Sequence, residues 1–131
     1  MKSFLPFLTF NGNAMEALTF YKDTFHDMEI EFLQEYGKET PEREGKIMQA
    51  VVSIDRQRLM ISDSRTPAEF SFTPSMSFYI ECGDMNEAEM YYRKLKKNGA
   101  ILMPLDEYGP GRYFAFVQDR FGLSWQLNFI K

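Results

Sequence analysis

Apolar residues recur at helical spacing in two stretches of the chain. Successive apolar positions in each stretch are three or four residues apart, which is typical of an amphipathic helix with one buried face. The positions are Ala14, Leu18, Tyr21 and Phe25 in the first stretch, and Met85, Ala88, Tyr92 and Leu95 in the second. We therefore expect helices over about 14–25 and 85–98.

Shorter apolar runs between Gly, Pro and Asn residues predict β-strands. In chain order the predicted strands are residues 4–10, 29–36, 46–54 and 58–63, then 75–82, 101–107, 112–118 and 124–130. The charged segment 38–45 is expected to form a mobile loop, and Gly99 to follow the end of the second helix. A polar segment with two prolines predicts a connector at 65–74. We predict a single domain, 1–131, with a first module at 1–64 and a second at 75–131.

The two modules repeat each other in sequence. At a spacing of 71 residues Phe7 falls on Phe78, Gly12 on Gly83, Asn13 on Asp84 and Glu16 on Glu87. An Asn or Asp followed three residues later by Glu predicts a capping box at the start of each helix. A second echo, at a spacing of 64, places Asp55-Arg56 on Asp119-Arg120. The predicted fold is therefore α+β, built from two tandem βαβββ modules.

Composition and charge narrow the class of partner. Aromatic residues make up 16% of the chain, with 13 Phe and 7 Tyr, which fits either a lined pocket or a plain aromatic core. The net charge is -4 and the basic residues are scattered, so nucleic acid is not expected as a partner. Cys82 is the only cysteine, which excludes an intramolecular disulfide and fits a cytoplasmic location. The apolar run at 4–8 is too short for a membrane span or a signal peptide.

Three segments resemble the PhnB-like proteins of the vicinal oxygen chelate superfamily, which includes glyoxalase I, bleomycin-resistance proteins and extradiol dioxygenases. The segments are Phe10–Tyr21, Leu59–Asp63 and Asp119–Leu127. The resemblance implies that each module curls a mixed four-stranded sheet around a cavity, and that the protein forms homodimers. The internal repeat supports this fold independently.

The resemblance also implies four metal-ligand positions, which enzymes of the superfamily fill with His, Glu or Gln. These positions fall on Pro6, Met60 or Ser62, Ser75 or Ser77, and Gln126. Only Gln126 is of an accepted type, and neutral amides and hydroxyls bind divalent metals weakly without carboxylate or imidazole partners. The single histidine, His26, follows the first helix. We therefore predict no metal and no cofactor.

Strand alternation predicts which side chains face the cavity. If Gln126 faces inward, Ser124 and Asn128 do so too, whereas Trp125, Leu127 and Phe129 pack beneath the helices. The residues predicted to bind a small organic ligand are Met60, Ser62, Ser75, Ser77, Tyr79, Gln126 and Asn128. A cavity filled by its own side chains is the alternative. A metal-free binding protein is the preferred function.

A metal-independent enzyme is the alternative function, because carboxylates beside Arg and Tyr can carry out acid–base chemistry at the cavity mouth. The candidates are Asp63, Glu107, Arg112 and Tyr113. The last three flank Gly109-Pro110-Gly111, which is also typical of a simple turn. Asp63 could equally cap the connector. A third possibility is a protein that acts through its dimer surface.

Methyltransferase activity is not expected, although some members of the family carry that name. A doubly wound methyltransferase needs alternating strands and helices and a glycine-rich loop after the first strand. This chain has two predicted helices and no such loop.

Overall fold

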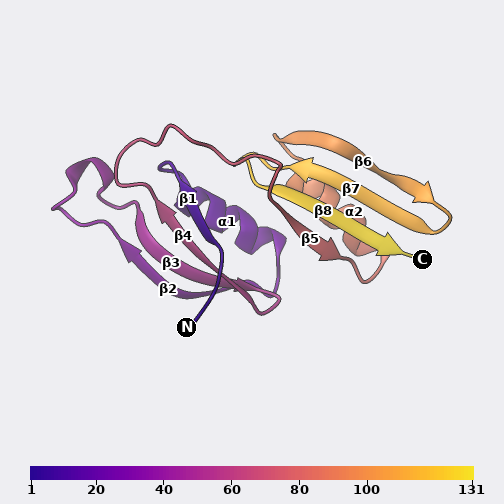
Figure 1. Ribbon diagram of the computed structural model, residues 1–131, viewed down its shortest axis with the longest axis horizontal. Coiled ribbons are helices and arrows are strands. Elements are labelled where there is room, and N and C mark those ends of the chain that lie inside the picture. Colours follow the sequence, from indigo (N-terminus) through magenta and orange to yellow (C-terminus); the bar gives the residue numbers. More distant parts are fainter. The chain divides into compact units, whose positions relative to one another are not determined.

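A computed structural model describes all 131 residues and divides into two compact units, Met1–Phe70 and Ser71–Lys131. The division falls within the predicted connector. Each unit contains one helix and four strands in the order βαβββ (Figure 1). The predicted fold class, α+β with two tandem βαβββ modules, is confirmed.

The first unit is a four-stranded mixed sheet in the order β1-β4-β3-β2. Its elements are β1 (Phe7–Phe10), α1 (Ala14–Thr24), β2 (Glu29–Glu35), a 3₁₀ turn η1 (Pro41–Arg43), β3 (Ile47–Ile54) and β4 (Gln57–Asp63). Strand β1 pairs with β4 in parallel, and the other pairs are antiparallel.

The second unit repeats this arrangement in the order β5-β8-β7-β6. Its elements are β5 (Ser77–Glu81), α2 (Met85–Leu95), β6 (Ala100–Gly109), β7 (Arg112–Gln118) and β8 (Ser124–Ile130). Strand β5 pairs with β8 in parallel, and β6, β7 and β8 are antiparallel neighbours.

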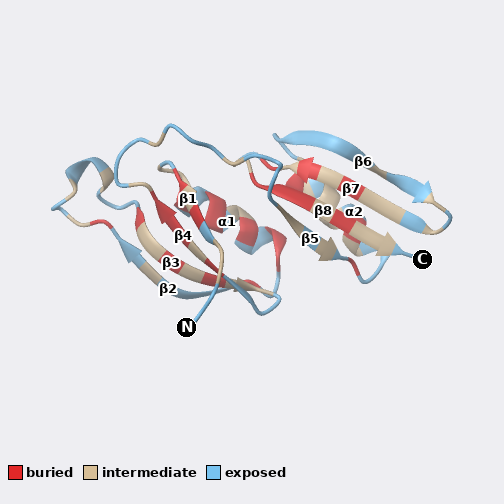
Figure 2. Cartoon of the chain, in the orientation of Figure 1, coloured by how far each residue is buried: buried red, intermediate tan, exposed pale blue.

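Each helix covers one face of its own sheet, and the core of each unit lies between them. The predicted apolar face of α1 is buried, and alternate residues of β1, β3 and β4 pack on the same side. In the second unit α2 contacts β8 and β7. Figure 2 shows the buried residues along the central strands, whereas β2 and β6 are largely exposed. The opposite face of each sheet carries no helix, and we call it the helix-free face.

The start of α1 is capped by a distant residue and not by the predicted capping box. Asn13 makes no side-chain cap. The buried Asp63 carboxylate takes its place: Oδ1 accepts hydrogen bonds from the Gly12 N–H at 2.8 Å and the Ala14 N–H at 3.0 Å, and Oδ2 accepts from the Ile47 N–H at 2.9 Å. The prediction for the first helix was therefore wrong, because a carboxylate satisfies these N–H groups better than a neutral amide.

The capping box of α2 is formed as predicted. Asp84 Oδ1 accepts from the Glu87 N–H at 2.8 Å, and Glu87 Oε1 accepts from the Gly83 N–H at 3.0 Å. The far end of α2 differs from prediction, since the helix ends at Leu95 and the residue with a left-handed backbone is Asn98, at φ 59°. Gly99 is needed for another reason. A Cβ there would overlap the carbonyl oxygen of Gln118.

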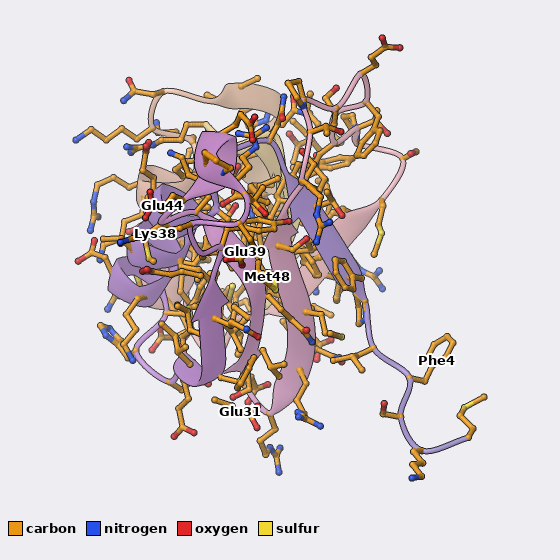
Figure 3. The ribbon with its side chains drawn as sticks, turned by 90° about the vertical axis from the view of Figure 1, so that its left-hand side faces the viewer. Phe4, Glu31, Lys38, Glu39, Glu44 and Met48 are labelled. Atoms are coloured by element: carbon orange, nitrogen blue, oxygen red, sulfur yellow. The ribbon has the colours of Figure 1, made fainter.

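Two strands begin two or more residues later than predicted, and the charged segment 38–45 contains a short 3₁₀ turn. Strand β1 begins at Phe7, and Phe4 is 90% exposed and projects away from the sheet (Figure 3). Strand β5 begins at Ser77, two residues after the predicted start. Residues 37–46, which include the labelled Lys38, Glu39 and Glu44, close on themselves through backbone hydrogen bonds around η1. Neither helix is long and apolar enough to cross a membrane.

Candidate functional site

The helix-free face of the second sheet carries most of the residues predicted to bind a ligand. The strand register arranges its side chains in rows across β5, β8, β7 and β6. The first row is Ser77, Ser124, Gln118 and Ala100; the middle row is Tyr79, Gln126, Phe116 and Met103; and the third row is Glu81, Asn128, Phe114 and Asp106. This face therefore combines hydroxyls and amides with aromatic rings.

One hydrogen bond joins two of the predicted residues. Gln126 Nε2 donates to Ser77 Oγ at 2.8 Å across the β5–β8 ladder, and both side chains are half-buried. Tyr79 and Asn128 lie on the same face, as strand alternation predicts. Ser75 does not join them. It lies in the turn before β5, where its hydroxyl pairs with that of Thr73 at 2.7 Å, because the strand starts two residues later than the sequence pattern suggests.

Ser124 is the one buried side chain on this face that lacks a hydrogen-bond partner. The residue is 1% exposed, and its Oγ has no partner in the chain. An unpaired buried hydroxyl costs about 1–3 kcal/mol, so native structures rarely keep one. Alternation placed Ser124 on this face, but no sequence signal could show that its hydroxyl stays unpaired.

The helix-free face of the first sheet is more apolar at the corresponding place. Its middle row is Phe7, Met60, Val51 and Phe32. Further along this face Thr9 is paired with Ser62, and Gln34 with Gln49. The predicted residues Met60 and Ser62 thus lie side by side on this face, in adjacent rows. Met60 occupies the place that Gln126 has in the second sheet.

This correspondence corrects the repeat spacing within the first strands. Phe7 lies on the helix-free face, whereas Phe78 packs against Trp125 with ring centroids 4.9 Å apart. The true counterpart of Phe7 is Tyr79, at a spacing of 72. The spacing of 71 holds for the helix starts at Asn13 and Asp84. The stretch between the strand position and the helix start is therefore one residue shorter in the second unit than in the first.

The donor groups do not fit a divalent metal of the kind that enzymes of the superfamily hold. Pro6 precedes β1 and has no side-chain donor, Met60 offers a thioether, and Ser77 already receives the amide of Gln126. Nowhere does the structure bring three His, Cys, Asp or Glu side chains together. Thioether, hydroxyl and amide groups alone make a weak set for zinc, nickel or iron.

The predicted acid–base residues do not meet on the helix-free face beside Gln126. Asp63 lies on the helix side of β4 with its carboxylate bound to three backbone N–H groups. Glu107 and Tyr113 are partners on β6 and β7, and Tyr113 shares the helix side with Ala115. The pKa of Tyr113 is raised by its hydrogen bond to the Glu107 carboxylate and by the charge of that group. Arg112 is exposed at the end of the same hairpin.

Two further residues are placed as the sequence predicted. His26 is exposed in the turn after α1. Cys82 is buried at the end of β5, and burial, followed by the negative charge of Glu87, raises the pKa of its thiol to about 11. A thiol of this kind is a poor nucleophile at neutral pH.

Comparison with known proteins identifies the family. The family described as 3-demethylubiquinone-9 3-methyltransferase matches residues 2–128. The chain belongs to this family of PhnB-like proteins. The solved structure of the PhnB protein from Bacillus cereus, which also carries the methyltransferase name, is 37% identical with a TM-score of 0.91, and the match covers 98% of this chain and 99% of that one.

Two other relatives of this PhnB-like chain are more distant. Protein YjdN of Escherichia coli (strain K12) is 24% identical over 140 residues, which cover 96% of this chain and 94% of that protein. The fosfomycin resistance protein FosX from Listeria monocytogenes has a TM-score of 0.69 at 10% identity, over 100% of this chain and 95% of that one. At that identity the likeness shows the fold alone. The resemblance to the PhnB-like proteins is confirmed by the family match and by the Bacillus cereus structure.

Proposed function

We propose that this PhnB-like chain binds a small organic molecule on the helix-free face of its second sheet, without a bound metal. The hydrogen bond from Gln126 to Ser77 is the observation that carries the proposal. It holds the amide in one orientation, and preorganised polar groups beside aromatic rings are typical of small-molecule sites.

The side chains around this pair support a binding role. Phe114 and Phe116 are half-buried, and Tyr79 is 58% exposed, so apolar and aromatic surface lies on both sides of the Gln126 amide. Asn128 lies in the next row and makes no hydrogen bond through its side chain within the chain. Such unused amide groups can select a ligand by its own donors and acceptors.

A methyltransferase function is not supported by this architecture, despite the family's description. Each unit has one helix and a mixed four-stranded sheet. The doubly wound fold that binds a nucleotide-like cofactor has a mostly parallel sheet with helices on both faces. A metal-independent enzyme is less well supported than a binding protein, since Glu107 and Tyr113 lie on the other side of the second sheet.

The proposal is tested by a thermal-shift screen of the purified protein against a library of small organic compounds. We expect at least one compound to raise the Tm in the presence of a chelator, and zinc, nickel, iron and manganese salts to leave the Tm unchanged. Gln126→Leu should abolish the shift.

The matched control is Gln57→Leu, which makes the same chemical change at an exposed residue outside this face. It should bind the selected compound as the wild-type chain does. A compound that shifts Gln126→Leu and the wild-type chain equally would refute the proposed site, and tight binding of one equivalent of metal would refute the metal-free function.

A further inference from the structure

The dipeptide Asn-Gly occurs twice in the chain, as Asn11-Gly12 and as Asn98-Gly99. Glycine has no side chain to hinder its backbone nitrogen, so this nitrogen attacks the amide carbon of a preceding asparagine more readily than the nitrogen of any other residue does. The other asparagines of the chain precede residues that carry a side chain. Asparagine is one of the thermolabile residues of proteins, and these two dipeptides are its most reactive positions here.

The reaction is a deamidation in which water is the only co-reactant. The glycine nitrogen loses its proton and forms a bond to the asparagine Cγ, the Cγ–Nδ2 bond breaks, and ammonia leaves. Water then opens the resulting succinimide ring at either of its carbonyls and leaves an aspartyl or an isoaspartyl residue. Each event therefore replaces a neutral amide by a carboxylate, which is negatively charged at neutral pH.

The fold restrains the Asn11 side chain through donors from two other segments. Its Oδ1 accepts hydrogen bonds from Arg43 Nη2 at 3.0 Å, Ser64 Oγ at 3.2 Å and the Ala68 N–H at 3.2 Å. Arg43 belongs to η1, and the other two donors follow β4. We call these three donors the Asn11 clamp. Rotation of the side chain toward its own backbone breaks these bonds.

The backbone after Asn11 is restrained as well. The Gly12 N–H, which must lose its proton in the reaction, donates to the buried Asp63 carboxylate at 2.8 Å. The same carboxylate accepts from the Ala14 and Ile47 N–H groups. Freeing the Gly12 nitrogen therefore disturbs the start of α1 and the start of β3 together, which makes local opening at this place rare.

Asn98 has no comparable restraint. It lies in the exposed turn between α2 and β6 at φ 59°, and its side chain makes no hydrogen bond within the chain. The Gly99 N–H donates to the Lys96 carbonyl oxygen at 2.9 Å, just beyond the end of α2, and helix ends fray readily. Asn11 is exposed too, so exposure alone does not separate the two sites.

We propose that Asn98 is a site of spontaneous deamidation in the folded chain, and that the Asn11 clamp protects the same dipeptide at Asn11-Gly12. The inference is independent of the proposed binding function. The new carboxylate would directly follow Lys96 and Lys97 in sequence. With time the folded chain thus acquires a more acidic form that is modified at this one turn.

The test follows both sites in one sample. The folded chain is incubated in mildly alkaline buffer made with heavy-oxygen water, then digested and analysed by peptide mass spectrometry. We expect Asn98 to react at least about tenfold faster than Asn11, because several net hydrogen bonds must break at Asn11. In urea, where the fold is lost, the two dipeptides should react at similar rates.

Two results of this experiment would overturn the proposal. In the first, Asn98 of the folded chain stays intact or reacts no faster than Asn11. In the second, the difference between the two sites persists in urea, which would assign it to the neighbouring residues in sequence and not to the fold.

Arg43→Ala tests the Asn11 clamp. It removes the guanidinium donor and should speed the reaction of Asn11 about three- to tenfold while leaving that of Asn98 unchanged. Arg65→Ala is the matched control, because Arg65 is exposed in the segment after β4 and makes no hydrogen bond to Asn11. An unchanged rate at Asn11 in Arg43→Ala, or a slower one through loss of a charge that activates the amide carbonyl, would overturn the protective role.

Asn98→Gly supplies a second readout. Glycine adopts the left-handed backbone without strain and has no amide to lose. On anion-exchange chromatography the incubated wild-type chain should develop a more acidic species that the Asn98→Gly chain does not form. An acidic species that appears equally in both chains would place the reaction elsewhere and overturn the assignment to Asn98.

Discussion

At the scale of single residues, the clearest feature is that two buried aspartates have a structural role: their carboxylates accept hydrogen bonds from backbone N–H groups. Asp63 fixes the start of α1 and the start of β3 together. Asp119 accepts from the Phe121 and Leu123 N–H groups and, through Oδ2, from the Trp125 indole at 2.9 Å. A carboxylate whose oxygens are occupied in this way is not available as a general base.

Asp63→Asn tests this structural role. The amide keeps one acceptor oxygen and turns an NH₂ donor toward backbone N–H groups, so the free energy of unfolding should fall by about 2–4 kcal/mol. Urea denaturation followed by circular dichroism measures the change.

Asp55→Asn is the matched control. Asp55 is exposed in the β3–β4 turn with φ 48°, a conformation that Asn tolerates well. Its stability should match that of the wild-type chain, and an equal loss in the two variants would contradict the role assigned to Asp63.

Cys82 gives a pH-dependent prediction. With a pKa of about 11 in the folded chain against an ordinary 9.0, the folded chain should hold about a hundredfold less thiolate at pH 8 than the unfolded chain, and iodoacetamide should alkylate it correspondingly slowly. Mass spectrometry with and without urea measures the two rates.

The raised pKa of Cys82 also makes the stability of the folded chain decrease at high pH. Well below pH 9.0 the thiol is neutral in both states and no stability is lost. As the pH rises toward 11 the unfolded chain ionises first, so stability decreases. Cys82→Ala should lack this part of the decrease; identical pH profiles would contradict the raised pKa.

At the scale of elements, the two exposed edge strands are protected in different ways. Strand β2 carries Glu29, Glu31 and Glu35, and like charges discourage pairing with another strand. Strand β6 instead contains Pro104 and three irregularities in its register with β7. Bulges and proline disturb the row of free N–H and C=O groups that a second strand would need.

The passage from α2 to β6 carries a strict requirement for glycine. A Cβ at Gly99 would overlap the carbonyl oxygen of Gln118, which is backbone and cannot turn aside. Gly99→Ala should therefore lower the free energy of unfolding by about 1–3 kcal/mol in a urea titration.

Gly83→Ala is the comparison for this prediction. A Cβ at Gly83 meets no atom within 4 Å, and its N–H can still donate to Glu87. This variant should remain within about 0.5 kcal/mol of the wild-type chain. If the two substitutions cost the same, close approach is not the reason for Gly99.

At the scale of the whole molecule, the fold could be predicted because its helices and strands follow from local sequence patterns. Helical spacing at Ala14, Leu18 and Tyr21, and alternation along β8, each depend on neighbours a few residues away. The placement of the candidate side chains was predicted in part for the same reason, since alternation alone sets Gln126 and Asn128 on one face. Ser75 was misplaced because strand ends follow turn hydrogen bonds, which residue patterns specify poorly.

The remaining features depend on contacts between distant parts of the chain. Asp63 caps a helix that begins 49 residues earlier in sequence, and no local motif announces such a pair. Whether the Ser124 hydroxyl has a hydrogen-bond partner depends on side chains of the two neighbouring strands and on the groups that these side chains already bind. The repeat was detected through its helices, and the one-residue difference between the strands became visible only in the register.

The position of the single tryptophan has a practical consequence. Trp125 is 3% exposed in the second unit, with its indole bound to Asp119 and its ring against Phe78. Its emission is thus a built-in optical reporter for that half of the chain alone. Fluorescence follows the loss of one core, circular dichroism averages over both, and coincident transitions from the two signals would mark the halves as melting cooperatively.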